Sequence, residues 1–273
     1  MLVDLHAHTI SSPDAIDTVE TMGRTAAVLG IDILAITDHC DAMATMPFFE
    51  FWGMDRQIVR FDETQARTRF LEATEQLNGA VKLLYGIELG EPHLRRTETR
   101  ELLLRQQYDV VLGSIHTFIG DADPVMLDYD AIHPNDVIRH YLQDLYEMVR
   151  FGGIDVICHI EYPLRYLPPR PGYLGSYRPF EEELRAIFRL AAMKGIALEI
   201  NGKSRRDGRF LLEPFVIDWY REAGGEYLSY GSDAHRASQL LRNSAEARAF
   251  ALDRGMKYFV YFEKRRAVPY RID

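Results

Sequence analysis

Histidine and acidic residues recur in this chain directly after short apolar segments. The first case is His6 and His8, which lie two residues apart near the start of the chain. Residues two apart in a strand point to the same side, so both imidazoles would reach one point at the strand's end. Imidazole is a common ligand of zinc, iron and related metals, although such a pair can also consist of unrelated histidines.

The same residue types follow the other predicted strands. Six of the nine histidines lie at the ends of five predicted strands, whereas histidines kept for packing would be scattered through helices and loops. In a parallel barrel all of these strand ends lie on one face, where active sites form. The candidate metal ligands are His6, His8, Asp14, His39, Glu88, His116, His159, Asp233 and His235.

This set is too large for one tetrahedral zinc ion, which takes three or four ligands. We therefore expect about two or three metal ions, with the carboxylate of Glu88 bridging two of them. Nitrogen and oxygen ligands without thiolate favour a catalytic site over a structural, cysteine-rich one. Sites with several metal ions typically activate water and bind phosphate oxygens, which predicts hydrolysis of phosphate esters.

Short apolar segments and longer amphipathic segments alternate along the chain. Strands are predicted over residues 2–5, 33–37, 81–87, 110–115, 155–158, 197–200, 226–230 and 257–262. Helices are predicted over residues 17–29, 63–77, 98–107, 135–151, 180–193, 211–223 and 238–254. A capping box from Asp17 to Glu20 is predicted to start the first helix, and Asn135 and Asp136 are predicted to cap the helix over 135–151. About seven β-α repeats predict an α/β domain over residues 1–273, either a (β/α) barrel or a doubly wound sheet.

With these motifs in place, the sequence resembles the polymerase-and-histidinol-phosphatase (PHP) superfamily from residue 2 to about residue 265. The matching motifs, in order, are His6-Ala7-His8, Thr37-Asp38-His39, Gly113-Ser114-Ile115-His116 and Gly231-Ser232-Asp233-Ala234-His235, with Glu88 and His159 where the family has its remaining ligands. The resemblance implies a distorted (β/α)7 barrel that holds up to three metal ions at the C-terminal ends of its strands. It implies one ion on His6, His8, Glu88 and Asp233, a second on Glu88, His116 and His159, and a third on Asp14, His39 and His235.

Within that superfamily, the length and the C-terminal segment are similar to those of the monofunctional histidinol-phosphatases. The implied reaction is hydrolysis of L-histidinol phosphate, with zinc, iron or manganese as cofactor. Asp233, or a water near His235, is expected to assist proton transfer to the leaving alkoxide. The alternatives are a related phosphoesterase acting on nucleotides or other small phosphate esters, and a metal-binding domain without catalysis.

Basic residues near the strand ends are candidates for binding the phosphate group. Arg165 follows His159, and we expect it to bind phosphate through its guanidinium fork. Lys203, Arg205 and Arg206 follow the sixth predicted strand, and of these Arg205 and Arg206 are the predicted phosphate ligands. The sequence departs from the family here, with Glu161 where those enzymes tend to have aspartate.

Several further residues receive predictions from their positions. Asp4 and Asp38 adjoin ligands and are expected to orient imidazoles, whereas Cys158 is expected to be buried packing. His133 and His140 are predicted not to bind metal, and His93 is left open. The long segments 40–61 and 161–179 are predicted to be irregular. Segment 40–61 could form a lid, a dimer contact or a small additional core, and segment 161–179 could overhang the site.

Composition limits the partners. The formal net charge of −9 and the absence of a basic stripe argue against a long nucleic acid, so the expected partner is a small phosphorylated substrate. With two cysteines, no visible signal peptide and no apolar run long enough to cross a bilayer, we expect a cytoplasmic protein that makes no membrane contact. The oligomeric state has no sequence signal.

Overall fold

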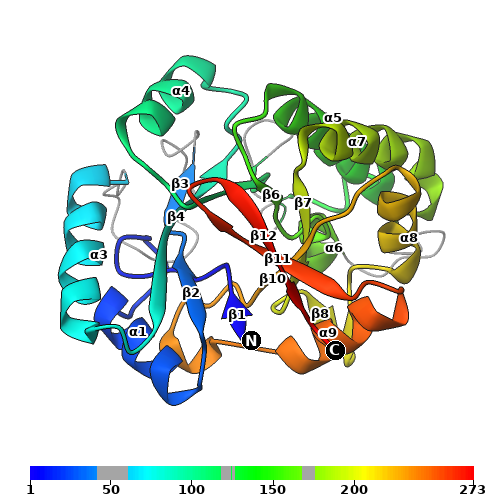
Figure 1. Ribbon diagram of the computed structural model, residues 1–273. Helices are drawn as coiled ribbons and strands as arrows, with labels where there is room; N and C mark the ends of the chain where they lie inside the picture. The colour runs from blue at the N-terminus through cyan, green and yellow to red at the C-terminus, as the bar shows by residue number, and fades with distance from the viewer. Residues whose placement is uncertain (42–60, 118–123, 125–126, 168–175) are drawn as a thin grey trace.

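The computed structural model describes residues 1–41, 61–117, 124, 127–167 and 176–273. Within these residues, parallel strands form a barrel that helices surround (Figure 1). The order around the sheet is β1 (Val3–Asp4), β2 (Ile33–Ile36), β4 (Lys82–Gly90), β5 (Val110–Ser114), β6 (Val156–Ile157), β7 (Ala197–Asn201) and β10 (Leu228–Gly231), and β3 (His39–Asp41) extends the sheet beside β4. These strands agree closely with seven of the predicted ones.

A short parallel bridge nearly closes the barrel between its first and last strands. Ala7 pairs with Ala234, and the backbone N–H of His8 donates to the carbonyl of Ala234 at 2.8 Å. A doubly wound sheet would leave these two strands at separate edges. The structure therefore confirms the distorted seven-stranded barrel.

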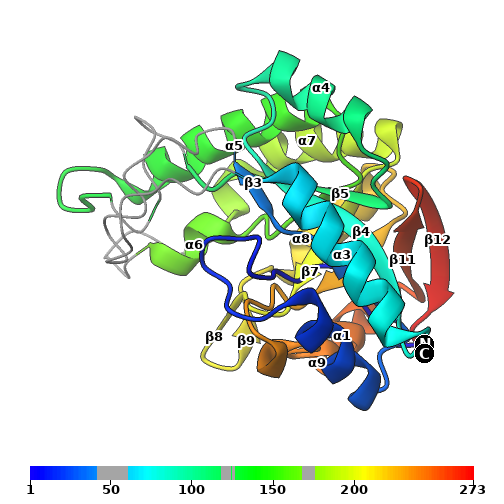
Figure 2. The same cartoon turned by 90° about the vertical axis from the view of Figure 1, so that its left-hand side faces the viewer.

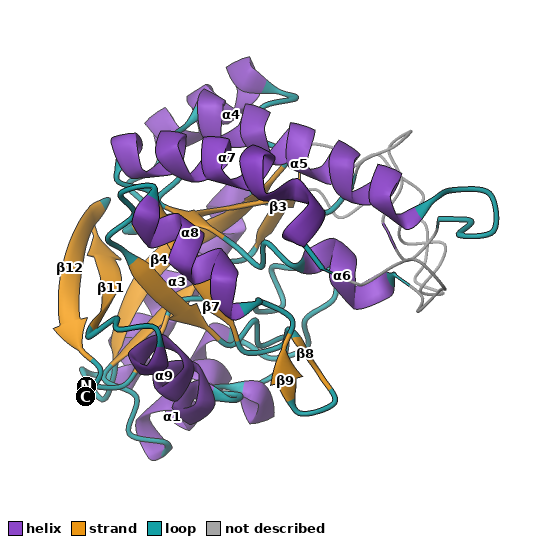
Figure 3. Cartoon of the chain, turned by 90° about the vertical axis from the view of Figure 1, so that its right-hand side faces the viewer, coloured by secondary structure: helices purple, strands orange, loops and turns teal. Residues whose placement is uncertain are grey.

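The helices form the outer layer, and α5 packs on α7 as α7 packs on α8 (Figure 3). They are α1 (Val19–Val28), α3 (Glu63–Leu77), α4 (Arg96–Arg105), α5 (Pro134–Phe151), α6 (Tyr162–Tyr166), α7 (Glu181–Lys194), α8 (Pro214–Glu222) and α9 (Ser244–Asp253), with single 3-10 turns at Arg178–Phe180 and Ala237–Gln239. Helix α3 has the predicted bounds, and α7 ends as predicted at Gly195, whose φ of 68° suits glycine. No described helix is long and apolar enough to cross a membrane.

Two predicted helix caps are wrong in detail. Helix α1 is capped by Thr18, whose hydroxyl accepts the N–H of Thr21 at 3.1 Å, while the carboxylate of Asp17 accepts the N–H of Ala237. Helix α5 is capped by the His133 ring instead of Asn135 or Asp136, and its first residue is Pro134. In both cases a neighbouring side chain satisfies the free N–H groups of the first turn.

The last predicted strand lies outside the barrel. It is β11 (Tyr258–Glu263), which forms an antiparallel hairpin with β12 (Arg266–Arg271) near both chain ends, with α6 on the opposite side of the molecule (Figure 2). At the tip of the hairpin, the backbone N–H of Arg265 donates to the carbonyl of Asp109 at 2.9 Å, and its guanidinium pairs with Asp155. These residues precede β5 and β6, so the hairpin closes the N-terminal end of the barrel and leaves the C-terminal end for a site.

The two long segments predicted to be irregular are described only in part. Residues 42–60 of the first and 168–175 of the second lie outside the described part of the chain, so their predicted roles remain predictions. The second segment is not irregular throughout, because it contains helix α6.

Candidate metal centre

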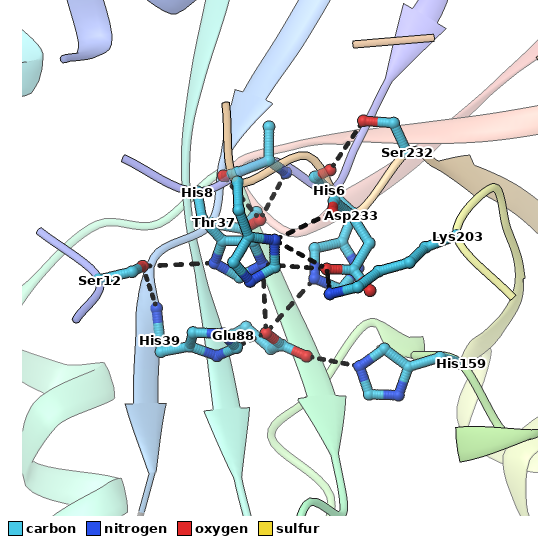
Figure 4. Close-up of polar contacts among 12 residues, drawn as sticks. His6, His8, Ser12, Thr37, His39, Glu88, His159, Lys203, Ser232 and Asp233 are labelled. Carbon is cyan, nitrogen blue, oxygen red and sulfur yellow. Dashed lines mark hydrogen bonds and ion pairs between the residues drawn. The ribbon is translucent and has the colours of Figure 1, made fainter. Parts of the chain in front are cut away.

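Side chains from the C-terminal ends of the barrel strands converge on Glu88 (Figure 4). Glu88 lies within β4, and its side chain has no exposed area. His6 and His8 follow β1 and are equally buried. The barrel therefore buries the carboxylate of Glu88 and the imidazoles of His6 and His8, whereas His39 and His235 at the rim of the cluster are 15% and 13% exposed.

The two oxygens of Glu88 face different imidazoles. Oε2 lies 3.3 Å from Nε2 of His6, 3.5 Å from Nε2 of His8 and 2.8 Å from Nδ1 of His39. Oε1 lies 2.9 Å from Nε2 of His159 and 3.3 Å from Nε2 of His116. One carboxylate thus stands between two groups of imidazoles, which is the arrangement that a bridging ligand needs.

Two aspartates complete the network. Asp233 Oδ1 lies 3.7 Å from Nε2 of His8 and 3.4 Å from Nδ1 of His235. Asp14 Oδ2 lies 2.9 Å from Nε2 of His235, and its Oδ1 lies 3.7 Å from Nε2 of His39. All nine candidate ligands predicted from the sequence are therefore brought together in one network.

The chemistry of these residues fits metal ions. Ligand atoms of His6, Glu88 and His159 lie within 4.8 Å of one another, as do those of His6, His8 and Asp233 and those of His8, His39 and His235. Within these groups, Nε2 of His6, Nε2 of His8, Nδ1 of His39 and Oε2 of Glu88 are buried and lie at ion-pair distance from one another, but none of them makes a hydrogen bond of good geometry. Buried polar atoms without a partner are costly, and a cation would supply the missing partner.

Burial and charge act against each other in this cluster. Burial alone would raise the pKa of Glu88, but His6, His39 and His116 hold it well below its ordinary value. Burial lowers the pKa of His6, yet the carboxylates of Glu199 and Glu88 raise it well above 6.5. Burial also lowers the pKa of His159, in this case to about 4. The cluster therefore contains both protonated and neutral imidazoles around an ionised carboxylate.

Three histidines direct Nε2 inward because Nδ1 faces an atom that can accept a hydrogen bond. Nδ1 of His6 lies 2.8 Å from Oε1 of Glu199, Nδ1 of His235 lies 3.0 Å from the carbonyl of Asp233, and Nδ1 of His116 lies 3.3 Å from Oδ1 of Asp41. Carboxylates and carbonyls accept hydrogen bonds, so Nδ1 carries the hydrogen. This arrangement orients metal-binding imidazoles in many proteins.

Glu199 is a site residue that the sequence analysis missed. Besides contacting His6, its Oε2 accepts the N–H of His159 at 2.8 Å and the side-chain amide of Asn201 at 3.0 Å. A Cβ at Gly231 would lie 2.3 Å from Oε1 of Glu199, so this position of the motif has no room for a side chain. A charged residue inside the apolar strand 197–200 was the signal that could have revealed it.

Asp4 and Asp38, which were predicted to orient imidazoles, make no direct hydrogen bond to an imidazole ring among the described residues. Asp4 accepts the backbone N–H groups of Ser232 at 2.8 Å and Leu241 at 3.0 Å, which ties β1 to the segment after β10. Asp38 accepts hydrogen bonds from Thr9 and from the hydroxyl of Ser12.

The cysteine and the remaining histidines have more ordinary surroundings. Cys158 is buried as expected, close to His6 and Glu199. His133 caps α5 and His140 is exposed. His93 lies 3.5 Å from Asp144 and belongs to none of the described groups of possible metal ligands.

Arg165 reaches the cluster. Its Nε donates to the hydroxyl of Ser204 at 2.8 Å, Nη2 donates to Oδ1 of Asn201 at 3.2 Å, and Nη1 lies 3.4 Å from Oδ2 of Asp233. The buried guanidinium therefore stands beside a candidate metal ligand, held by two neutral side chains.

The second cation at the site is Lys203, not Arg205 or Arg206, which were the predicted phosphate ligands. Nζ of Lys203 lies 3.3 Å from Oδ1 of Asp233. Arg205 instead donates to Asn243 at 2.6 Å, and Arg206 donates to the carbonyls of residues 164 and 165 at 2.7 and 2.8 Å. The short hairpin formed by β8 (Arg205–Arg206) and β9 (Arg209–Phe210) gives both arginines these other partners.

Comparisons with known proteins identify a family and agree with the fold. The family model described as PHP domain matches residues 4–203. A probable histidinol-phosphatase of Clostridium acetobutylicum is 24% identical over 268 residues, covering 97% of this chain and 98% of that protein. A probable phosphatase of Shewanella loihica is 30% identical over 243 residues, covering 88% of this chain and 80% of that protein.

A solved structure has the same fold. It is the histidinol phosphate phosphatase of Lactococcus lactis subsp. lactis Il1403, complexed with zinc, L-histidinol and phosphate. Its TM-score is 0.83 with 21% sequence identity, and the match covers 98% of each chain.

Proposed function

Because the chain belongs to the PHP domain family, we propose that this phosphatase hydrolyses L-histidinol phosphate to L-histidinol and phosphate with the help of two to three metal ions. The observation that carries the proposal is the position of Glu88 between two groups of imidazoles, with the cations of Arg165 and Lys203 beside Asp233. The relatives named for histidinol phosphate support the choice of substrate.

Zinc, iron and manganese are the ions that this donor set suits, because imidazole and carboxylate together accept all three. We assign one ion to His6, His8, Glu88 and Asp233, a second to Glu88, His116 and His159, and a third to Asp14, His39 and His235. When bound, such ions activate water and neutralise the oxygens of a phosphate group.

The protein's own cations would bind the phosphate group from the other side. Arg165 presents a planar fork that matches two phosphate oxygens, and Lys203 adds a point charge. Both side chains face Asp233. A phosphate bound between these two cations and the metal centre would therefore accept hydrogen bonds from both without a large movement of either side chain.

Asp233 and His235 are the proposed groups for handling protons. Burial alone would raise the pKa of Asp233, but Lys203, His6 and His235 hold it well below its ordinary value. An ionised Asp233 suits accepting a hydrogen bond from the attacking water. Proton delivery to the leaving alkoxide then falls to a water near His235, because Nε2 of His235 is assigned to the metal ion and its Nδ1 faces the carbonyl of Asp233.

A substrate panel tests the proposed function. Protein with quantified zinc, iron and manganese is assayed with histidinol phosphate, nucleoside monophosphates, sugar phosphates and bis-p-nitrophenyl phosphate. We expect two to three metal ions per chain and a kcat/KM at least about tenfold higher on histidinol phosphate than on the other monoesters, a margin of about 1.4 kcal/mol in transition-state binding. A preference for a nucleotide would overturn the substrate, and preference for the diester would overturn the reaction class.

The cation pair has its own prediction. Arg165→Ala and Lys203→Ala should each lower kcat/KM by about ten- to a hundredfold with metal content unchanged, since a charge-assisted hydrogen bond contributes about 1.5–3 kcal/mol. Arg165→Lys should recover only part of the rate because lysine lacks the fork. Arg205→Ala is the matched control, since it removes an equal charge from the same segment without touching Asp233, and it should stay within about twofold of the wild type. An equal loss in all three alanine variants would point to net charge instead of direct contact.

A further inference from the structure

Ser12 lies at a junction between two histidines and an aspartate. Its hydroxyl oxygen is 3.3 Å from Nδ1 of His8 and 3.0 Å from the backbone nitrogen of His39, and both contacts are drawn in Figure 4. The same oxygen is 2.7 Å from Oδ1 of Asp38. Ser12 is 3% exposed, and these three protein groups are the hydrogen-bond partners of its hydroxyl.

The direction of these hydrogen bonds follows from what each group can do. A hydroxyl has one hydrogen to donate and two lone pairs that accept. The backbone N–H of His39 can only donate, so it occupies one lone pair of Ser12. Asp38 accepts the N–H of Thr9 at 2.6 Å and the hydroxyl of Thr9 at 2.8 Å, which marks it as an acceptor. The hydrogen of Ser12 therefore goes to Asp38.

With its hydrogen committed, Ser12 has only a lone pair left for His8. We infer that Ser12, held by Asp38, fixes His8 in the tautomer that carries hydrogen on Nδ1 and leaves Nε2 bare. Nε2 is the atom that faces Oε2 of Glu88 at 3.5 Å and Oδ1 of Asp233 at 3.7 Å. Ser12 is thus a positioning residue for His8, and this role rests on the proposed metal centre.

His8 needs such a device more than His6, His116 and His235 do. Nδ1 of His6, His116 and His235 faces a carboxylate or a carbonyl, which accepts a hydrogen bond without further help. A hydroxyl can turn, and a serine that donated to Nδ1 would favour the opposite tautomer, with hydrogen on Nε2. That hydrogen would point into the cluster and exclude a cation. Asp38 prevents this rotation because it accepts the hydrogen of the Ser12 hydroxyl. This gives Asp38, which adjoins His39 but makes no hydrogen bond to a described imidazole ring, a role in the site.

The ring nitrogens of His8 can be examined directly in metal-free protein. Two-bond correlation of ring ¹⁵N and carbon-bound ¹H distinguishes a protonated nitrogen from a bare one, and His8→Gln assigns the signal. We expect wild-type His8 to show a protonated Nδ1 and a bare Nε2. A wild-type spectrum with hydrogen on Nε2 would overturn the inference, and this arm needs no variant to fold.

Variants then test whether Ser12 is the cause. Ser12→Ala should give a mixture of tautomers at His8 and weaken zinc binding by about ten- to a hundredfold in competition with a chromophoric chelator, the usual cost of losing such a partner. Ser12→Thr keeps the hydroxyl and should restore both. Ser11→Ala is the matched control, since the Ser11 hydroxyl accepts from Arg69 at 3.1 Å, and it should behave as wild type.

The possible outcomes separate this inference from the proposed function. Neither the spectrum nor zinc competition involves a substrate, so an error in the substrate would leave both results intact. Wild-type tautomer and affinity in Ser12→Ala would refute the role of Ser12 while leaving the metal centre in place. Failure of wild-type protein to bind zinc would refute the metal centre, while the ring spectrum would still report the tautomer.

Discussion

Replacing Glu88 by glutamine is expected to lower kcat/KM by about ten-thousandfold, the scale of losing an essential catalytic group, and to reduce bound metal in the same sample. Both oxygens of Glu88 face imidazoles, Oε2 toward His6 and Oε1 toward His159. Glutamine keeps the size of the side chain but has one oxygen, one amide group and no charge. It therefore cannot serve both groups, and its amide hydrogens would point at one of them.

The measurement is metal content and steady-state kinetics on the same preparation. Glu72→Gln on the exposed face of α3 is the control for a lost carboxylate and should match the wild type in both. Circular dichroism shows whether the variant is folded. A folded Glu88→Gln protein with full metal occupancy and ordinary turnover would show that Glu88 is not a bridging ligand.

Metal affinity is expected to rise steeply with pH, by about tenfold per pH unit for each proton that the ion displaces. Burial lowers the pKa of His39, but the carboxylates of Glu88 and Asp14 raise it well above 6.5. Burial also lowers the pKa of His116, but Asp41 and Glu88 raise it well above 6.5. Glu199 and Glu88 have the same effect on the pKa of His6. A raised pKa means that the metal-free protein holds these protons at neutral pH. A metal ligand must be unprotonated, so binding releases them, and the affinity falls as the solution becomes more acidic.

The rise should continue up to the pH, above 6.5, at which these histidines lose their protons without metal, and it should level off beyond that pH. Calorimetric titration with zinc in two buffers of different protonation enthalpy counts the protons released, and we expect between one and three. Asp41→Asn is the matched variant, because Asp41 is the strongest of the charges that raise the pKa of His116. It should release fewer protons than the wild type. Release of no protons, or an affinity that falls with rising pH, would contradict the charge states described here.

The sequence predicted the set of side chains at the centre, and its resemblance to a known family predicted the barrel instead of a doubly wound sheet. Parallel strands end on the same face, so histidine and acidic residues placed after several strands must meet, whatever the details of the loops. His6, Glu88 and His159 illustrate this, since they come from three different strands and their ligand atoms meet within 4.8 Å. Spacing of two along a strand was enough to aim His6 and His8 at the same oxygen of Glu88.

Only the tertiary structure decided which neighbours serve those side chains. Lys203, Arg205 and Arg206 are close in sequence, yet Lys203 alone of the three contacts Asp233, because the hairpin after it gives both arginines partners elsewhere. Glu199 could be read from the sequence as an unusual charge in a strand, but its partner His6 is 193 residues away. The hydrogen of Ser12 is likewise directed by Asp38, which is 26 residues further along the chain. Hydrogen-bond direction depends on every atom around a group, and those atoms come together only when the barrel closes.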